Sequence, residues 1–142
     1  MKAYADTSFL ISLYTPDANS ARAAAQMSRG STVFLVTPFG EVEITNALEL
    51  RVFRKEIRRV EAEAAYHAFQ GDIRSEVLSL RPLPSAVYEK ARQLARKHTA
   101  ALGVRTLDIL HVAAALVLRA EVFYTCDASR RKLARVAGLT TY

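Results

Sequence analysis

Four acidic residues of the sequence stand beside apolar runs, where charged side chains are costly to place. Asp6 and Asp127 each end a short run that is predicted to form a strand, and Glu43 and Asp108 each lie early in a segment predicted to be helical. If the four carboxylates share one pocket, they repel one another and need a cation to cancel their charge. Mg²⁺ and Mn²⁺ suit that task because they prefer carboxylate oxygens and water as ligands. The pattern therefore predicts a divalent-metal site that can bring a phosphodiester close to acidic side chains.

Each of these acids also has a purely structural interpretation. An aspartate at the end of a strand often caps the following helix, as Asp6 and Asp127 would do. An acid in the first turns of a helix is favoured by the helix dipole, which is sufficient for Glu43 or Asp108 taken alone. The metal-site hypothesis depends on all four acids meeting. Ligands of open parallel sheets gather outside the carboxyl ends of the strands, and the order of strands and helices brings the four acids to that edge.

The elements that must position these acids are short strands alternating with helices. Strands are predicted at residues 2–5, 32–36, 78–82 and 121–125, with a last one at 139–142. Helices are predicted at residues 7–14, 20–29, 38–57, 59–77, 84–98, 107–119 and 128–137. The residues expected to cap helix starts are Thr7 or Ser8, Thr37 and Thr106, and Gly138 is expected to end the last helix. Strands separated by helices indicate a parallel sheet with right-handed crossovers in an α/β sandwich.

The composition is that of one basic globular domain. The chain has 142 residues, with 20 Lys and Arg against 14 Asp and Glu and a formal net charge of +6, which favours a polyanionic partner. Residues 30–40 are the longest stretch without a charged side chain, too short for a membrane span. The early Asp6 interrupts any signal peptide, and the single Cys126 excludes an internal disulfide. One cytoplasmic domain over residues 1–142, with no membrane partner, is therefore expected.

Four segments of the sequence resemble, in order, the motifs of the PIN-domain family. Residues 4–10 (YADTSFL) are similar to the opening Asp-Thr-Ser/Asn strand. Thr37, followed by residues 43–48 (EITNAL), resembles the second motif, a hydroxyl-capped helix that carries a glutamate. Residues 108–115 (DILHVAAA) are similar to the third motif, and residues 124–127 (YTCD) with 137–139 (AGL) to the fourth. The ordered set covers the chain from end to end.

The resemblance implies a three-layer α/β/α sandwich with a central parallel sheet of four to five strands. It also implies a Mg²⁺- or Mn²⁺-dependent endoribonuclease whose metal is held by Asp6, Glu43, Asp108 and Asp127. Asp6 and Asp108 are the expected direct ligands, and the other two acids complete the shell or orient the nucleophile. At this length the chain is most similar to VapC-type toxins of toxin–antitoxin pairs. Such relatives imply an RNA substrate, a VapB-like antitoxin as partner and a homodimer.

Residues next to the four acids are candidates for supporting roles. Glu41 is the rival of Glu43 as the site glutamate, and the motif match favours Glu43. Thr7, Ser8 and Thr125 are candidates to hydrogen bond a ligating carboxylate or water, with helix capping and strand packing as the alternative.

Two further side chains near the site invite a catalytic interpretation. His111 lies three residues after Asp108, but a buried, hydrogen-bonded histidine is expected there rather than a general base. Cys126 has no base near it in the sequence, so we expect a small buried residue rather than a nucleophile.

Basic residues close to the acids are candidates for RNA binding. Arg105 precedes Asp108, and Arg130 and Arg131 follow Asp127, so all three are expected to flank the pocket, with a solvated helix face as the alternative. Two other functions remain open. One is a PIN-like nucleic-acid-binding or RNA-processing domain without a toxin role. The other is a phosphoryl-accepting, receiver-like signalling domain, although the sequence lacks the paired acids and late lysine that such a domain needs.

Overall fold

In the computed structural model, which describes residues 1–142, five strands form one sheet in the order β3-β2-β1-β4-β5. All neighbouring strands are parallel, as the alternation of strands and helices predicts. The first strand of the chain therefore lies at the centre of the sheet, between the second and the fourth. The strands are β1 (Lys2–Ala5), β2 (Val33–Val36), β3 (Leu78–Leu80), β4 (Val122–Tyr124) and β5 (Thr140–Thr141).

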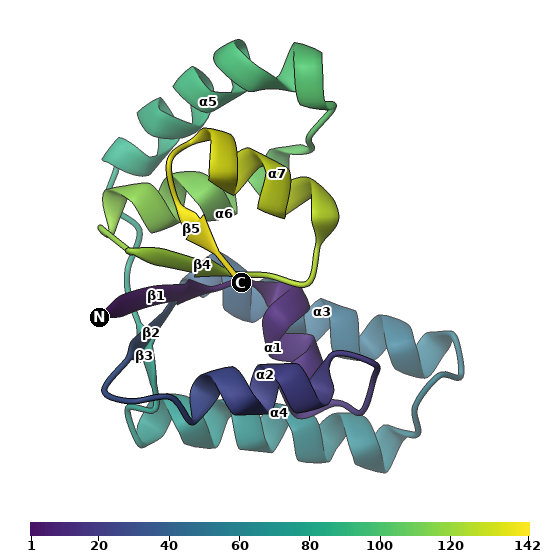
Figure 1. Cartoon of the computed structure of the whole chain (residues 1–142). Coiled ribbons are helices and arrows are strands. Elements are labelled where there is room, and N and C mark those ends of the chain that lie inside the picture. Colours follow the sequence, from purple (N-terminus) through teal and green to yellow (C-terminus); the bar gives the residue numbers. More distant parts are fainter.

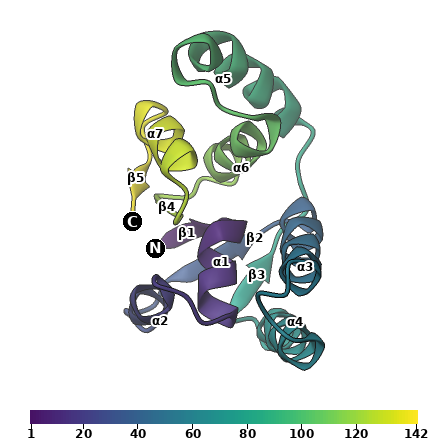
Figure 2. The same ribbon diagram turned by 90° about the vertical axis from the view of Figure 1, so that its right-hand side faces the viewer.

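Seven helices cover the two faces of this sheet and complete a three-layer α/β/α sandwich (Figure 1, Figure 2). This architecture confirms the fold class expected from the sequence. One layer holds α1 (Thr7–Tyr14), α2 (Ser20–Met27), α3 (Pro38–Phe53) and α4 (Arg59–Arg74). The other layer holds α5 (Ala86–Leu102), α6 (Thr106–Val117) and α7 (Ala128–Val136). None of these helices combines the length and apolar character that a membrane span requires.

Side chains alternate along each strand between two hydrophobic cores, one on each face of the sheet. On β1, Ala3 and Ala5 join the core formed with α1 to α4, whereas Tyr4 joins the core formed with α5 to α7. Leu35 of β2 and Phe123 of β4 point to the same side as Tyr4. Because both faces of the sheet are covered, these short strands consist mostly of apolar residues.

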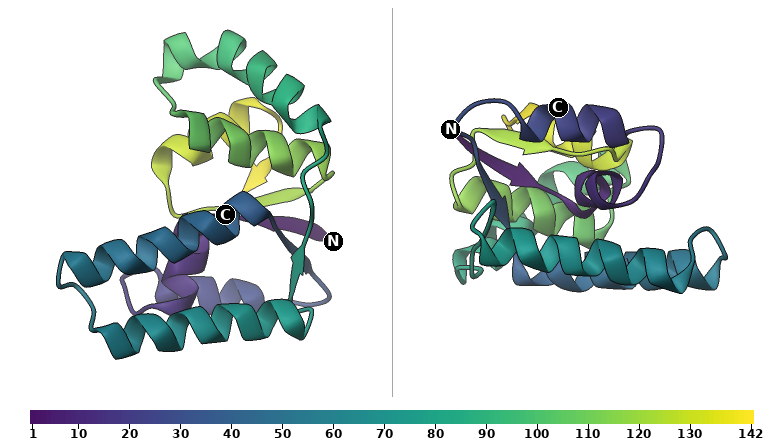
Figure 3. Two further views of the ribbon diagram at one scale, coloured as in Figure 1. Left: turned by 180° about the vertical axis from the view of Figure 1, so that it is seen from behind. Right: turned by 90° about the horizontal axis from the view of Figure 1, so that it is seen from below.

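Helices α3 and α4 form a pair that projects beyond the edge of the sheet (Figure 3). The predicted helix 38–57 ends at Phe53, and the predicted helix 59–77 ends at Arg74. Lys55 and Glu76 adopt the left-handed backbone conformation, with φ of 59° and 62°, which breaks each helix earlier than its apolar pattern suggests. Helix α5 instead runs four residues beyond the predicted end, to Leu102, and stops at Gly103, whose φ is 65°. The other boundaries agree with the sequence prediction to within two residues.

Two of the predicted helix caps are wrong, and both corrections involve residues near the predicted site. Asp6, not Thr7 or Ser8, caps α1, because its carboxylate accepts a hydrogen bond from the Phe9 amide. Thr106 is the first residue of α6 and does not cap it. The predicted cap at Thr37 is confirmed, since its hydroxyl accepts a hydrogen bond from the amide of Gly40.

Candidate functional site

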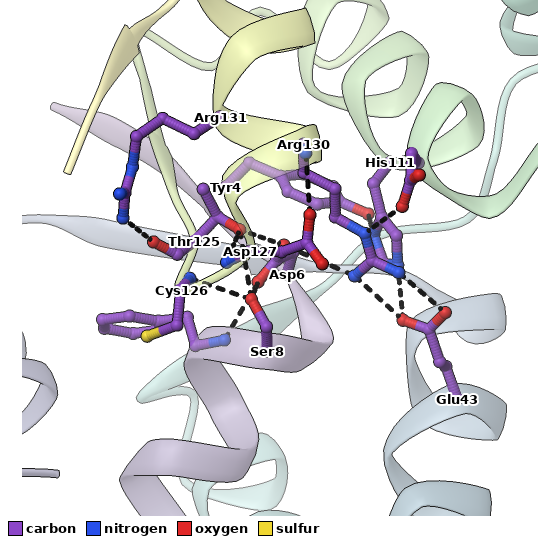
Figure 4. A network of polar contacts seen from close by, with 12 residues as sticks. Tyr4, Asp6, Ser8, Glu43, His111, Thr125, Cys126, Asp127, Arg130 and Arg131 are labelled. Carbon is purple, nitrogen blue, oxygen red and sulfur yellow. Dashed lines mark hydrogen bonds and ion pairs between the residues drawn. The ribbon is translucent and has the colours of Figure 1, made fainter. Parts of the chain in front are cut away.

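The four predicted acids lie near one another at the carboxyl ends of the central strands. Figure 4 shows three of them, Asp6, Glu43 and Asp127, around Arg130. Asp6 follows β1, and Asp127 lies shortly after the neighbouring strand β4. Glu43 comes from α3, which begins directly after β2, and Asp108 comes from the first turn of α6. The chain order of the elements therefore places the acids as the sequence predicts, at one edge of the sheet.

Asp6 is fully buried and held by four hydrogen-bond donors. Its Oδ1 accepts from the Phe9 amide at 2.9 Å and from the Ser8 hydroxyl at 2.7 Å. Its Oδ2 accepts from the Thr125 hydroxyl at 2.5 Å and from Arg130 Nη1 at 3.4 Å. The expected support of a site carboxylate by Ser8 and Thr125 is therefore present. Thr7 does not hydrogen bond to Asp6; its buried hydroxyl lies beside Glu43 instead and helps to lower the pKa of that carboxyl.

Asp127 and Asp108 also stabilise the starts of the helices that carry them. Asp127 Oδ1 accepts from the Arg130 amide at 2.8 Å and caps α7. Asp108 Oδ2 accepts from the Arg105 amide at 3.0 Å, where α6 begins. For these two aspartates, capping a helix does not exclude a place in a shared site, because the capping hydrogen bond uses only one of the two carboxylate oxygens.

The side chain of Arg130 lies among three of the four acids. Its Nε donates to Asp108 Oδ1 at 2.7 Å, and its two terminal nitrogens donate to Glu43 at 3.2 and 3.1 Å. Burial alone would lower the pKa of Arg130, but the charge of Asp6, the hydrogen bond to Asp108 and the charge of Glu43 raise it above its usual value. The guanidinium thus remains charged and neutralises part of the cluster.

Glu43 is oriented by a chain of hydrogen bonds that crosses the core on the α6 side of the sheet. His111 Nε2 lies 2.8 Å from Glu43 Oε1, His111 Nδ1 lies 2.9 Å from the Tyr4 hydroxyl, and that hydroxyl lies 3.2 Å from Thr37 Oγ1. Burial acts to raise the pKa of Glu43, but the hydrogen bond from His111, the nearby Thr7 hydroxyl and the charge of Arg130 lower it to about 2. His111 is buried and hydrogen bonded, as expected from the sequence.

A cleft of about 830 Å³ opens beside the acids. It is lined by Glu43, Asp108, Asp127, Arg105 and Arg130, among others. Asp6 does not line it, because the Arg130 side chain and the Thr125 hydroxyl contact Asp6 from that side. The cleft therefore gives a substrate access to three of the four acids.

The remaining candidates from the sequence lie at different distances from the acids. Glu41 lines a separate groove between α3 and α4 with Tyr66 and Phe69, so Glu43 alone of the two glutamates reaches the site. Arg131 donates to the carbonyl oxygen of Thr125 at 2.7 Å. Cys126 is half-buried, and its burial raises the pKa of the thiol, which disfavours a nucleophilic thiolate.

The donor set suits a hard divalent cation in its chemistry. The cluster consists of carboxylates and already surrounds one cation, the guanidinium of Arg130. In the arrangement observed, no three acidic, histidine or cysteine side chains are placed to hold a metal ion. The cation that cancels charge here is therefore Arg130, a role that sequence reasoning misses. Its sequence signal is its place three residues after Asp127, in the first turn of α7.

Comparisons with known proteins agree with this architecture. The family model described as PIN domain matches residues 3–139 of the chain. The structure of VapC20 from Mycobacterium tuberculosis, described as a sarcin–ricin loop cleaving toxin, is similar with a TM-score of 0.72 and 19% identity, over 97% of this chain and 96% of that chain. VapBC2 of Rickettsia felis, bound to a DNA fragment from its promoter, is similar with a TM-score of 0.69 and 14% identity, over 100% of this chain and 98% of that chain. VapBC-1 of nontypeable Haemophilus influenzae is similar with a TM-score of 0.67 and 14% identity, over 100% of this chain and 97% of that chain. Among proteins of curated function, none matches the chain in sequence.

Proposed function

The chain belongs to the PIN domain family, and on this basis we propose that it is a metal-dependent endoribonuclease that hydrolyses RNA phosphodiester bonds. The observation that carries the proposal is the meeting of Asp6, Glu43, Asp108 and Asp127 at one sheet edge, beside an open cleft. Such a concentration of carboxylates repels a phosphate unless a cation lies between them. The surplus of basic residues elsewhere on the chain supports an RNA substrate.

The cofactor in this proposal is Mg²⁺ or Mn²⁺. Asp6 and Asp108 would hold it directly, with Asp127 and Glu43 completing the ligand set. A divalent cation bound there supplies Lewis acidity for the charge that develops on a phosphodiester under in-line attack. The all-oxygen character of the four donors supports this choice over a softer metal.

The chain's own residues have distinct duties in this proposal. Ser8 and Thr125 hold the Asp6 carboxylate in one orientation. His111 does the same for Glu43, whose pKa of about 2 keeps it ionised at neutral pH. Arg105 lines the cleft and offers a positive charge to the RNA backbone.

The biological role in this proposal is that of a toxin of a toxin–antitoxin pair. The similarity of its fold to VapC20, described as a toxin, and to the VapBC assemblies supports it, and implies a VapB-like antitoxin as partner. We also propose a homodimer, because exposed apolar side chains gather on α3 and at the start of α4: Val42, Leu50, Phe53 and Val60. Light scattering of the purified chain tests the dimer, for which twice the monomer mass of 15.7 kDa is expected.

The proposed activity is tested by incubating the protein with a structured RNA and Mg²⁺ or Mn²⁺. Cleavage is expected to stop on addition of EDTA, and Asp6→Asn and Asp108→Asn are expected to lower it by about 100-fold or more, because each loses a ligating charge. Asparagine is also a good helix cap, so Asp6→Asn preserves the start of α1.

Glu41 and Glu43 offer a matched pair of controls on one helix. Glu43→Gln is expected to reduce cleavage strongly, whereas Glu41→Gln, which faces the groove between α3 and α4, is expected to leave it within about twofold of the unmodified protein. Full activity of Asp6→Asn or Asp108→Asn would overturn the assignment of the site. Cleavage that persists in EDTA would overturn its dependence on metal.

A further inference from the structure

Arg130 occupies the point on which three carboxylates of the cluster converge. Its Nε, Nη1 and Nη2 all donate to carboxylate oxygens, at distances between 2.7 and 3.4 Å, and the residue is only 9% exposed. A charged side chain so deeply buried is stable only when it is paired in this way. Arg130 is therefore the cation that the structure places in the cluster.

The backbone of Arg130 is fixed, whereas its side chain borders two open spaces. The Arg130 amide is fixed by the Asp127 carboxylate, in the first turn of α7. Side chains in the first turn of a helix point back over its N-terminus, here toward the sheet edge. Arg130 also lines both the 830 Å³ cleft and a second cavity of about 270 Å³ that includes Thr7 and Arg51. Both spaces therefore border its guanidinium.

A second cation cannot join the cluster while Arg130 stays there. The two oxygens of Asp6 already accept four hydrogen bonds, one of them from Arg130, and no face of this residue is exposed. Asp108 Oδ1 is likewise taken by Arg130 Nε. Two positive charges a few ångströms apart in a poorly solvated site repel strongly.

We propose that Arg130 and the divalent cation are alternative occupants of the same carboxylate cluster, so that Arg130 sets the concentration of metal at which the site becomes loaded. The proposal rests on the proposed function, since it concerns the metal of that site. Metal binding then requires the guanidinium to leave, and the apparent affinity is lowered by the small fraction of molecules in which it has left. Arg130 is accordingly a determinant of metal affinity and not a ligand of the RNA in the resting chain.

The test compares Mn²⁺ binding by the full chain and by Arg130→Gln in isothermal titration calorimetry. Glutamine has no charge and does not hold the carboxylates, so the variant is expected to bind Mn²⁺ about tenfold more tightly. In EDTA the variant is also expected to melt at a lower temperature than the unmodified chain, because its carboxylates then repel one another. Addition of Mn²⁺ is expected to raise the melting temperature of the variant by more than that of the unmodified chain. Arg135→Gln on the same helix removes an equal charge away from the acids and is expected to match the unmodified chain.

A second measurement needs no variant and remains informative if Arg130→Gln fails to fold in EDTA. The Nε–H of Arg130 is protected by its bond to Asp108, so its exchange with solvent, followed by NMR, is expected to accelerate when Mg²⁺ is added. Mn²⁺ affinity that is unchanged or weaker in Arg130→Gln, or an Nε–H that stays protected with Mg²⁺ bound, overturns the exchange of occupants while RNA cleavage can persist. Absence of metal binding in both proteins overturns the proposed function as well.

Discussion

At the scale of single residues, the proton positions around His111 follow from its neighbours. Glu43 is ionised and can only accept, so His111 Nε2 carries a proton and donates to it. Burial raises the pKa of Tyr4, which keeps the phenol protonated and able to donate to His111 Nδ1. The Thr37 hydroxyl then donates to the Tyr4 oxygen. This chain of hydrogen bonds fixes the orientation of Glu43.

Removing the Tyr4 hydroxyl tests this assignment. Tyr4→Phe keeps the ring stacked on Phe123 but leaves His111 Nδ1 without a donor. We expect kcat for RNA cleavage to fall about tenfold with KM nearly unchanged, since substrate contacts are untouched. The ¹⁵N shifts of His111 are expected to change from a single Nε2–H tautomer to a mixture. Tyr66→Phe, which alters a hydroxyl on α4 bonded only to Gln70, serves as control. A pure Nε2–H tautomer in Tyr4→Phe contradicts the assignment.

Individual residues also mark how much of the site can be predicted from the sequence. The acids are predictable because each stands at a strand end or helix start, and parallel topology sends those positions to one edge. The role of Arg130 is not predictable, because the residue belongs to a run of basic residues that looks like any exposed helix face. Its side chain points inward only because α7 begins at Ala128. The hydrogen bond between Tyr4 and His111 joins residues 107 positions apart, and no local sequence pattern predicts it.

At the scale of elements, α1 is tied to α4 by one hydrogen bond beneath the site. The Tyr14 hydroxyl donates to Asp72 Oδ2 at 2.5 Å, and the Tyr14 ring packs edge-on against Phe69 at 5.8 Å. Helix α1 begins next to Asp6 and carries Ser8, so its placement affects the geometry of the acids. Burial and the nearby carboxylate of Asp72 raise the pKa of Tyr14 above its ordinary value.

This tie predicts a loss of stability at alkaline pH. The folded state favours neutral Tyr14, so its contribution is fully present below the ordinary tyrosine pKa near 10 and declines as pH rises above it. Tyr14→Phe is expected to lower the free energy of unfolding by about 1–2 kcal/mol at pH 8, and by less at pH 11, in urea titrations. Tyr88→Phe, at an exposed position on α5, is expected to change neither value. An equal deficit of Tyr14→Phe at both pH values contradicts the prediction.

The order and type of the elements are largely predictable from the sequence, whereas their ends are less so. Apolar runs between turn residues locate β1, β2 and β4 because these inner strands are mostly buried, whereas the edge strands β3 and β5 are partly exposed. Helix ends depend on single backbone conformations, such as those of Lys55 and Glu76, which side-chain pattern does not reveal. The cap at Thr37 is predicted correctly because Pro38 fixes the first turn of α3. In α1 and α6 the N-cap lies one residue earlier than predicted, so Asp6 and Arg105 occupy the N-cap positions in place of Thr7 and Thr106.

At the scale of the whole molecule, the surplus of positive charge lies outside the acidic cluster. Beyond its four acids and Arg130, the chain has 19 Lys and Arg against ten Asp and Glu, several of them in surface ion pairs. Arg51 and Arg54 line the second cavity together with Glu43 and Arg130, so positive charge reaches the border of the cluster from α3. In the proposed function, positive charge at this border would lead an RNA backbone toward the acids.

This separation predicts unequal effects of equal charge changes. Arg54→Gln is expected to weaken binding of a labelled RNA hairpin about threefold to tenfold and to reduce the slope of log affinity against log salt by about one. Arg96→Gln, on α5, is expected to have a much smaller effect. Fluorescence anisotropy in EDTA, where the proposed cleavage is suppressed, measures both. Equal losses for the two variants indicate that the overall charge, and not the border of the cluster, governs RNA binding.

The central position of β1 has a consequence for how the protein is made. Asp6 is synthesised well before the side chains that contact it, because Thr125 and Arg130 follow 119 and 124 residues later. Contacts over such separations form late in folding. A nascent chain that stops before β4 has three of the five strands and lacks Asp127 and Arg130. The proposed nuclease is therefore expected to be inactive until β4 and α7 have been synthesised.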